Sequence, residues 1–497
     1  MIKFSLNGKT VTSREGCTVA AAIANTGAYT MRQSVKGGPR GPLCGMGICF
    51  ECAVTLGGQQ HIRSCQLPLE PGMVVETCGS VQPHIYTSAT ETKRPASRSF
   101  DVLIIGGGPA GIAAAIAASK TGLAIGIVDD NPAAGGQIWR KERNAKLAEF
   151  AACTAELLPG TRIVDAPQPG VLIGESGSQI LELRYGKLIL ATGARELFLP
   201  FPGWTLPNVF GAGGLQAFVK GGLAIQDKRV VVAGSGPLLV AVAETLQKYG
   251  ANIVAIVEQA SLSSAVHFGL ELARQPAKIG QAAKLLWALR SVAVYRANFP
   301  VQAEGSGKLE RIVLRGQKTI DCDYLACGFG LVPNNELAAL AGCQLHGNFV
   351  KVDELQQTSM ENIYAVGELT GIGGVEKSLV EGSIAGLAAV GDTKQAKDLF
   401  AKREDAIRFQ AVLEKRFALC PELLQLANAD TTICRCEDVT KADIEQHNSW
   451  REAKLHTRCG MGACQGRVCG PAIELIKGWR PESIRPPLSP VNVGTFL

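Results

Sequence analysis

Histidine is scarce in this chain of 497 residues, which contains only six. None lies beside a serine or a cysteine in a pattern typical of a nucleophile with its base. No general base for attack on a substrate carbon can be assigned, so we predict that the chain supplies no catalytic residue for such a step. The histidines, each expected at the surface or at a helix cap, are His61, His84, His267, His346, His447 and His456.

Strong charge of one sign is also missing. The formal net charge is +6, and no long run of lysine and arginine with interleaved aromatic residues occurs. Nucleic acid is therefore excluded as an expected partner. A hydrophobic fraction of 46% with 19% charged residues is ordinary for a globular enzyme, and the length suits about three or four domains.

Targeting and membrane-spanning signals are lacking as well. The first residues, MIKFSLNGKTVTSREG, have no cationic start followed by an apolar core, which a secretory signal requires. The uncharged stretch from Val102 to Ser119 contains a glycine-rich turn, so it predicts a buried strand, turn and helix instead of a span. We expect a cytoplasmic protein, with peripheral attachment at the inner face of the membrane as the alternative.

Cysteine, in contrast, is plentiful, with sixteen residues, and nine of them form two clusters. In a reducing compartment, clustered cysteines indicate metal ligands or redox groups more than disulfides. In the first cluster, four residues separate Cys44 from Cys49 and two separate Cys49 from Cys52, the plant-type spacing for a [2Fe-2S] cluster. Cys65 is the nearest candidate for the fourth thiolate. A zinc site or a set of buried thiols is the alternative.

The second cluster contains five cysteines near the C-terminus. A one-residue spacing followed by a second pair near a helix start resembles the [2Fe-2S] module of bacterioferritin-associated ferredoxins. We predict Cys434, Cys436, Cys464 and Cys469 as ligands and Cys459 as the spare, because the glycine turn after Cys459 then presents Cys464 as a helix begins. Zinc or an empty site is the alternative. Outside the clusters, Cys17, Cys78, Cys322 and Cys327 are expected to be packing residues.

A glycine fingerprint between the clusters predicts an FAD site. The pattern G-x-G-x-x-G follows an apolar strand and opens an alanine-rich helix, and an acidic residue follows the next strand, where it reaches a ribose hydroxyl. Segments resembling flavin-contacting parts of two-dinucleotide-domain flavoproteins are GGQ, LILATGA and NIYAVGE. The predicted contacts are Gly106, Gly108, Pro109, Ala110, Gly111, Asp129, Gly136, Gln137, Ala191, Thr192, Gly193, Gly367 and Glu368.

A second strand, turn and helix begins at Arg229 and predicts another dinucleotide-binding unit. Gly234 and Gly236 are present, Leu239 replaces the third glycine, and Glu258 stands where a ribose contact is expected. The pattern allows NAD(P)H, ATP as a structural ligand, or a vestigial site. No Cys-x-x-Cys pair lies near the flavin segments, which disfavours a disulfide relay like that of thioredoxin reductase.

The fold class that these patterns predict is α/β, a two-dinucleotide-binding-domain flavoprotein of glutathione-reductase type. A β-grasp ferredoxin-like domain precedes it, and a small helical [2Fe-2S]-binding domain follows. The predicted divisions are a ferredoxin-like domain at 1–82, a linker at 83–98, an FAD domain at 99–222 and 325–395, a second dinucleotide domain at 223–324, linker helices at 396–429, a C-terminal [2Fe-2S] domain at 430–482 and an extended tail at 483–497.

The order of modules resembles a known group. DVLIIGGGPAG, NPAAGGQIWR, LATGARE, PFPGW, CGFGLVPN, YAVGE, CRCEDVT and TRCGMGACQGRVCG resemble the FAD-containing alpha subunit of dye-linked amino-acid dehydrogenases. This group includes opine oxidases, hydrogen cyanide synthase, heteromeric proline and D-hydroxyproline dehydrogenases, and part of the sarcosine oxidase alpha subunit. CGMGICFECAVTL with IRSC resembles the separate small [2Fe-2S] subunit of these complexes, here fused to the flavoprotein.

The resemblance implies an oxidoreductase subunit that transfers electrons. A partner flavin subunit of D-amino-acid-oxidase type would oxidise the amine, a small third protein would be a further partner, and this chain would pass electrons to a quinone or respiratory acceptor. That division of labour accounts for the missing general base. The alternative is a self-sufficient NAD(P)H-dependent flavin reductase that feeds its own ferredoxin domain. A third reading, a scaffold with decayed cofactor sites, predicts a chain without flavin or iron.

Overall fold

A computed structural model describes residues 1–77, 95–177, 179–272 and 276–491. The chain divides into two compact units, each built from segments distant in sequence. The first unit comprises Met1–Pro83, Glu196–Gly330 and Val412–Glu482, and the second His84–Arg195, Leu331–Ala411 and Ser483–Leu497. Residues 78–94, which include Cys78, His84 and most of the predicted linker, lie outside the described residues.

The N-terminal module, residues 1–77 of the first unit, is a five-stranded sheet in the order β2-β1-β7-β5-β6. Asn7 and Gly8 both adopt positive φ, which gives the tight hairpin that the sequence predicts. The side chain of Thr18 caps helix α1 by accepting from the Ala21 N–H. The bounds are β1 Ile2–Leu6, β2 Lys9–Ser13, α1 Val19–Asn25, β3 Arg32–Gln33, β4 Pro39–Arg40, β5 Ala53–Leu56, β6 Gln59–Arg63 and β7 Val74–Glu76.

The second dinucleotide domain, residues 196–330 of the first unit, has a parallel sheet in the order β15-β22-β16-β17-β18. Residues 196–222 belong here and not with the predicted FAD domain, because β15 extends this sheet by pairing with β22. The bounds are β15 Val209–Gly211, α4 Ala212–Lys220, β16 Arg229–Gly234, α5 Leu238–Lys248, β17 Asn252–Glu258, α6 Leu262–Leu272, α7 Pro276–Ala288, β18 Ala293–Arg296, β19 Pro300–Glu304, β20 Arg311–Leu314, β21 Thr319–Asp321 and β22 Tyr324–Gly328.

The C-terminal module, residues 421–482 of the first unit, is small and mostly helical. Its core gathers the apolar side chains of Ile433, Val439, Ile444 and Ile473 with Trp450 and three cysteines. A capping box between Thr440 and Asp443 starts its second helical segment. The bounds are η3 Pro421–Gln425, β27 Thr432–Cys434, β28 Val439–Thr440, α12 Lys441–Glu445, α13 Trp450–Thr457 and α14 Cys469–Lys477.

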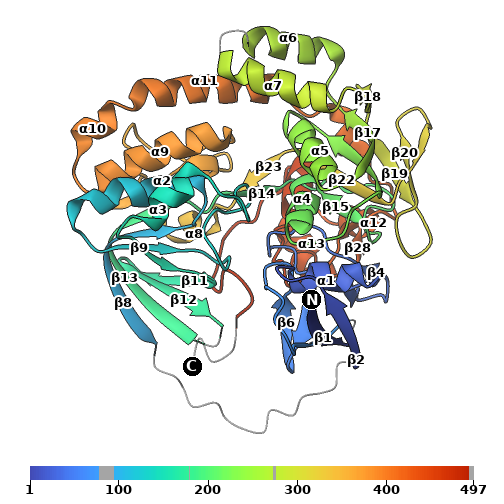
Figure 1. Ribbon diagram of the computed structural model, residues 1–497, viewed down its shortest axis with the longest axis horizontal. Helices are drawn as coiled ribbons and strands as arrows, with labels where there is room; N and C mark the ends of the chain where they lie inside the picture. The colour runs from blue at the N-terminus through green and yellow to red at the C-terminus, as the bar shows by residue number, and fades with distance from the viewer. Residues whose placement is uncertain (78–94, 178, 273–275, 492–497) are drawn as a thin grey trace. The chain divides into compact units, whose positions relative to one another are not determined.

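The second unit contains a seven-stranded sheet in which β10, β9, β8, β13 and β26 run parallel. Helices α2 and α9 lie together over one face of this sheet (Figure 1). Glycine at position 382 of α9 permits this close approach, because a Cβ there would lie 2.1 Å from the Ala110 carbonyl oxygen of α2. The bounds are β8 Ala96–Ile105, α2 Pro109–Ala118, η1 Ser119–Thr121, β9 Ile125–Val128, α3 Ala145–Ala151, β10 Glu156–Leu158, β11 Thr161–Gln168, β12 Val171–Ser176, β13 Gln179–Leu190, β26 Ile363–Ala365, η2 Gly367–Leu369 and α9 Gly374–Ala389.

Short elements complete the chain. They are β14 Ala194–Glu196, β23 Leu331–Pro333, α8 Glu336–Leu340, β24 Leu345–His346, β25 Phe349–Val350, α10 Thr393–Lys397 and α11 Phe400–Arg416. The stretch from Val102 to Ser119 forms the end of β8, a turn and α2, as the sequence predicts. Within the described ranges, none of the helices combines the length and apolar character that crossing a bilayer requires.

Candidate redox site

The first glycine fingerprint forms a tight cradle between β8 and α2. Gly106 has a φ of +113°, and a Cβ there would lie 2.2 Å from the Ala191 carbonyl oxygen. A Cβ on Gly111 would lie 1.8 Å from the Gly106 carbonyl oxygen. Gly108 is the N-cap of α2 and Pro109 its first residue, so free N–H groups of the helix start adjoin the turn. This cradle fits the pyrophosphate of a dinucleotide.

Asp129 lies at the carboxyl end of β9, beside the same turn. Its two oxygens accept from the Gly107 N–H at 2.5 Å and the Asn131 N–H at 2.7 Å. Burial and the nearby Asp130 together raise the pKa of the Asp129 carboxyl to about 6, although these N–H groups oppose the rise. The oxygen bonded to Asn131 also accepts from the Asn131 side-chain amide at 2.7 Å, so the oxygen that faces Gly107 is the one with a second lone pair for a ribose hydroxyl.

The loop after β9 packs on the glycine turn. The Gly135 N–H donates to the Gly107 carbonyl at 2.7 Å, and a Cβ on Gly136 would lie 2.9 Å from the Gly108 Cα. The side-chain oxygen of Gln137 accepts from Arg140 at 2.7 Å. Gly136 therefore adjoins the fingerprint. The roles of Gly136 and Gln137 as FAD contacts stay predictions.

The remaining predicted flavin residues lie at the ends of β13 and β26. Two hydrogen bonds hold Thr192 to Asn334. The Thr192 hydroxyl donates to the Asn334 backbone carbonyl at 2.7 Å, and the Asn334 side-chain amide donates to the Thr192 carbonyl at 2.9 Å. The Glu368 carboxylate accepts from the N–H groups of Gly373 and Gly374, at the start of α9. Glu368 thus fixes the helix start at the carboxyl edge of the parallel strands, where ligands of such sheets bind.

Sequence reasoning missed a buried ion pair under this segment. Lys377 and Glu381 lie one turn apart on α9, and their side chains are 2% and 3% exposed, with nitrogen and oxygen 2.9 Å apart. The Lys377 amine also donates to the carbonyls of Gly367 and Gly371, and Glu381 accepts from the Gly367 N–H. The signal was the i,i+4 spacing of opposite charges in an otherwise apolar helix.

In the second dinucleotide domain, the glycine turn is covered by the chain itself. The Ser235 hydroxyl donates to the Phe417 carbonyl at 3.0 Å, and the Phe417 ring lies 3.7 Å from the place a Gly236 Cβ would take. Gln259, directly after β17, donates to the Ala418 carbonyl at 3.0 Å. The Glu258 carboxylate accepts from the Gly236 and Ala260 N–H groups.

The N-terminal cysteine cluster lies on a buried loop. Cys44, Cys49, Cys52 and Cys65 are each at most 3% exposed. The Met46 N–H points at the Cys44 sulfur (3.4 Å) and the Glu51 N–H at the Cys49 sulfur (3.5 Å). Cys52 adjoins the pairing of β5 with β6, where Ser64 donates to its carbonyl, so Cys65 is brought to the same place.

This donor set fits thiolates. Contact with Cys49, together with backbone N–H groups, lowers the pKa of the Cys44 thiol to about 6 although burial opposes the shift, whereas burial and the same contact raise the pKa of the Cys49 thiol. Gly47 adopts a φ of +73°, and a Cβ there would lie 2.1 Å from the Gln66 side-chain oxygen. Glycine at position 47 lets the loop take this positive φ and pack against Gln66, and the four buried cysteines fit a [2Fe-2S] cluster.

The loop also packs on helix α4. The Gly211 N–H donates to the Leu43 carbonyl at 2.9 Å, and a Cβ on Gly214 would lie 2.3 Å from that oxygen. Glu196, which is buried, accepts from the Gly213 and Gly214 N–H groups at the helix start. Burial raises the pKa of the Glu196 carboxyl to about 8. Sequence reasoning did not assign Glu196.

The C-terminal cluster brings all five cysteines together. The sulfurs of Cys434, Cys459 and Cys469 lie within 4.8 Å of one another, and those of Cys436 and Cys464 are 3.5 Å apart. The Cys436 thiol interacts with Cys434 as well as with Cys464. The donor set fits a metal–thiolate site, and Cys459, predicted as the spare, lies inside the group. The choice of four ligands stays a prediction.

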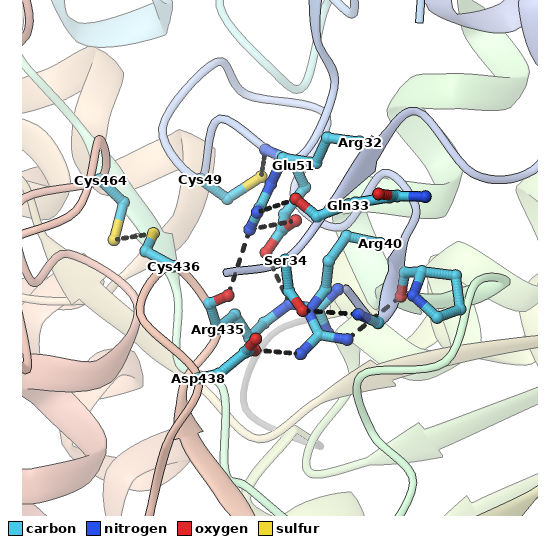
Figure 2. A network of polar contacts seen from close by, with 12 residues as sticks. Arg32, Gln33, Ser34, Arg40, Cys49, Glu51, Arg435, Cys436, Asp438 and Cys464 are labelled. Atoms are coloured by element: carbon cyan, nitrogen blue, oxygen red, sulfur yellow. Dashed lines mark hydrogen bonds and ion pairs between the residues drawn. The ribbon is translucent and has the colours of Figure 1, made fainter. Parts of the chain in front are cut away.

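Buried charges connect the loops of the two clusters (Figure 2). The Arg435 Nε donates to Glu51 Oε1 at 2.8 Å, and Arg32 Nη2 lies 2.9 Å from Glu51 Oε2. The Arg40 guanidinium and the Asp438 carboxylate form a second pair at 2.5 Å. Glu51, Arg435 and Asp438 lie within the quoted cysteine motifs, but the sequence does not show that these charges meet.

The other cysteines predicted as packing residues, Cys17, Cys322 and Cys327, are buried. The cysteines that the structure describes form no disulfide with one another. Cys327 lies in β22, Cys322 directly follows β21, and Cys17 lies two residues before α1.

The chain is similar to known proteins over most of its length. A pyridine nucleotide-disulphide oxidoreductase family model matches residues 100–385, and a 2Fe-2S iron-sulfur cluster binding domain matches residues 1–79. The HcnB subunit of hydrogen cyanide synthase from Pseudomonas aeruginosa is 30% identical over 419 residues, which span 74% of this chain and 90% of that protein. The A subunit of opine oxidase from Rhizobium meliloti is 30% identical over 452 residues, spanning 80% of this chain and 84% of the relative.

The fold has a solved counterpart. L-proline dehydrogenase from P. horikoshii superposes with a TM-score of 0.73 over 100% of this chain and 97% of that one, at 18% identity. The family implies FAD, and the N-terminal domain implies a 2Fe-2S cluster. The chain is an oxidoreductase that belongs to the pyridine nucleotide-disulphide oxidoreductase family, among the relatives of HcnB and of the opine oxidase A protein, with a 2Fe-2S domain fused at its N-terminus.

Proposed function

We propose that the chain is the electron-transfer subunit of a heteromeric amino-acid or opine dehydrogenase. A partner protein with its own flavin oxidises the amine, and this chain passes the electrons through FAD and two iron–sulfur clusters to a quinone or respiratory acceptor. The observation that carries the proposal is the combination of one dinucleotide cradle with two buried cysteine clusters. The relatives are themselves subunits of larger enzymes, which supports a hetero-oligomer.

Within this function, the residues described above act by holding and orienting. The glycine cradle and the start of α2 would hold the pyrophosphate, Asp129 a ribose, and the start of α9 the flavin side. The bound FAD would supply the exchange between two-electron and one-electron transfer. The Lys377–Glu381 pair fixes the backbone of Gly367 and so keeps the cradle in place.

The distribution of histidine supports placing the amine chemistry on a partner. In the described part of the second unit, the one histidine is His346, which is exposed on β24. His447 and His456 stack at 5.1 Å between ring centres within the C-terminal module, which belongs to the first unit. The proposal therefore assigns proton abstraction from the substrate to the partner protein.

Purification of the native complex tests this function. We expect an FAD-containing partner to co-purify, and we expect the complex, but not this chain alone, to reduce an artificial dye with proline, hydroxyproline, glycine or an opine. A small third protein in the complex would fit the same proposal. Full dye reduction by the isolated single chain with an amino-acid substrate would contradict it.

A self-sufficient NAD(P)H-dependent reductase is the second candidate, and Gly234, Gly236 and Glu258 favour it. The segment Phe417–Cys420 argues against it, because this segment bonds to Ser235 and Gln259 on both sides of the place where a dinucleotide would lie. An anaerobic NADH titration of the purified chain separates the two. Rapid bleaching of the flavin absorbance supports the reductase, and an unchanged spectrum supports the electron-transfer role.

A further inference from the structure

A buried ion pair joins the loops of the two cysteine clusters. Glu51 lies in sequence between Cys49 and Cys52, and Arg435 lies between Cys434 and Cys436. Their side chains meet at 2.8 Å, and each is 1% exposed. Glu51, which lies between two predicted ligands of the N-terminal cluster, thus pairs directly with Arg435, which lies between two predicted ligands of the C-terminal cluster.

Arg32 strengthens this connection from a third direction. Its guanidinium pairs with Glu51 and donates to the Arg435 carbonyl at 3.2 Å. The electrostatic interactions of its guanidinium include Cys49 and Cys436, one cysteine from each cluster. Glu51 likewise interacts with Cys436, across the boundary between the modules.

Arg435 is also held on its other side. Its guanidinium lies over the Trp204 ring, 4.9 Å from the centre, and donates to the Trp204 carbonyl at 2.9 Å. The Trp204 indole N–H in turn donates to the Thr432 carbonyl at 2.7 Å, two residues before Cys434. Arg435 is therefore fixed in one orientation, so the geometry between the cysteine loops is fixed as well.

We propose that Glu51, Arg32 and Arg435 hold the two iron–sulfur clusters as a coupled pair, between which an electron passes directly inside this chain. The inference rests on the proposed function, which supplies the second cluster. In the transfer, one cluster loses an electron and is oxidised, the other gains it and is reduced, and no bond or proton changes. Replacing a buried ion pair by apolar residues is often neutral for stability, so a role in positioning explains the pair better than stability does.

Electron paramagnetic resonance of the full-length chain tests the coupling. We expect the signals of the fully reduced protein to be broadened by interaction between the two clusters. In Cys469→Ser, which removes the C-terminal cluster, and in Cys65→Ser, which removes the N-terminal one, the surviving signal becomes sharp. If the wild-type spectrum equals the sum of the two variant spectra, the clusters are not coupled and the inference is wrong.

Iron content separates this outcome from a failure of the proposed function. Wild-type protein with the iron of two clusters but without magnetic interaction overturns the inference alone. Wild-type protein with the iron of one cluster overturns the cofactor set of the proposed function and the inference with it.

Reduction potentials give an independent test with a matched control. Glu51→Gln removes a negative charge that faces both clusters, so both midpoint potentials move to more positive values. Glu437 also adjoins Cys436 but pairs with Arg458 within the C-terminal module, so Glu437→Gln shifts the C-terminal potential and leaves the N-terminal one unchanged. A shift confined to one cluster in Glu51→Gln contradicts the shared contact. If Glu51→Gln fails to fold, the wild-type resonance comparison decides.

Discussion

At the scale of single residues, Asp129 combines deep burial with a charge that the folded chain disfavours. The pKa of its carboxyl is raised from 3.8 to about 6, so the folded state holds the proton more tightly than the unfolded state. Stability is therefore lost as pH rises through this range. We expect the free energy of unfolding of the FAD-free chain, measured by urea denaturation, to be lower at pH 7 than at pH 5. Asp129 contributes on the order of 1 kcal/mol to this difference. Asp129→Asn should reduce this difference by about that amount, while the raised pKa of Glu196 leaves a remainder of the same sign. An unchanged difference in the variant would show that Asp129 does not contribute.

Replacing Lys377 should lower the free energy of unfolding by more than its hydrogen bonds contribute, because its buried partner would lose its counter-ion. Lys377→Met leaves the Glu381 carboxylate buried without its cation, which typically costs about 3 to 5 kcal/mol. We expect a lower thermal midpoint and loss of flavin during purification, read from the ratio of visible to ultraviolet absorbance. The double variant Lys377→Met with Glu381→Leu should recover part of the midpoint, because no charge is then left alone. Equal midpoints in the single and double variants would contradict this account.

At the scale of elements, helix α4 offers two adjacent glycines with opposite expectations. A Cβ on Gly214 would lie 2.3 Å from the Leu43 carbonyl oxygen, whereas a Cβ on Gly213 meets nothing closer than 3.7 Å. Gly214→Ala should displace the loop that carries Cys44 and reduce the visible absorbance of the N-terminal cluster. Gly213→Ala should keep the cluster and gain up to about 1 kcal/mol from helix propensity. Equal cluster content in both variants would show that the loop does not depend on this contact.

The loop before α14 poses a question of ligand choice. Our prediction assigns Cys464 to the cluster and leaves Cys459 outside, although both lie among the other three thiols. We expect Cys464→Ser to lose the iron of the C-terminal cluster and Cys459→Ser to retain it, as measured by metal analysis and visible spectra. The reverse pattern would exchange their roles, and iron loss in neither variant would argue against a cluster with four thiolates here.

The two α/β sheets were predictable element by element, because their signals are local. The strand ending at Ile105, the turn at Gly106 and the helix from Pro109 follow from a period and a glycine pattern. The sequence prediction placed residues 196–222 in the FAD domain, whereas the structure groups them with the second dinucleotide domain. No local signal indicates that β15 pairs with β22, which lies more than a hundred residues further along the chain. The same holds for Glu51 with Arg435, whose separation of 384 positions hides their contact.

At the scale of the whole molecule, the N-terminal module is bound to the rest of its unit like a docked subunit. The Thr18 N–H donates to the Gly221 carbonyl, and Asn25 bonds with both Gly222 and Ala224. The Arg40–Asp438 pair links the same module to the C-terminal one. These contacts, with the Glu51–Arg435 pair, are polar and directional, so they fix the orientation in which the modules meet.

A divided chain tests whether these contacts suffice without the covalent connection. When residues 1–86 and 87–497 are expressed together as two polypeptides, we expect them to co-purify as a stable complex that keeps the visible spectrum of the intact protein. Arg435→Glu in the longer piece places two carboxylates face to face in a buried site, where like charges cost several kcal/mol, and it should abolish co-purification. The matched variant Arg458→Glu, at an exposed pair within the C-terminal module, should leave the complex intact. Separation of the unaltered pieces would mean that the fusion, and not the interface, holds the two cysteine clusters together.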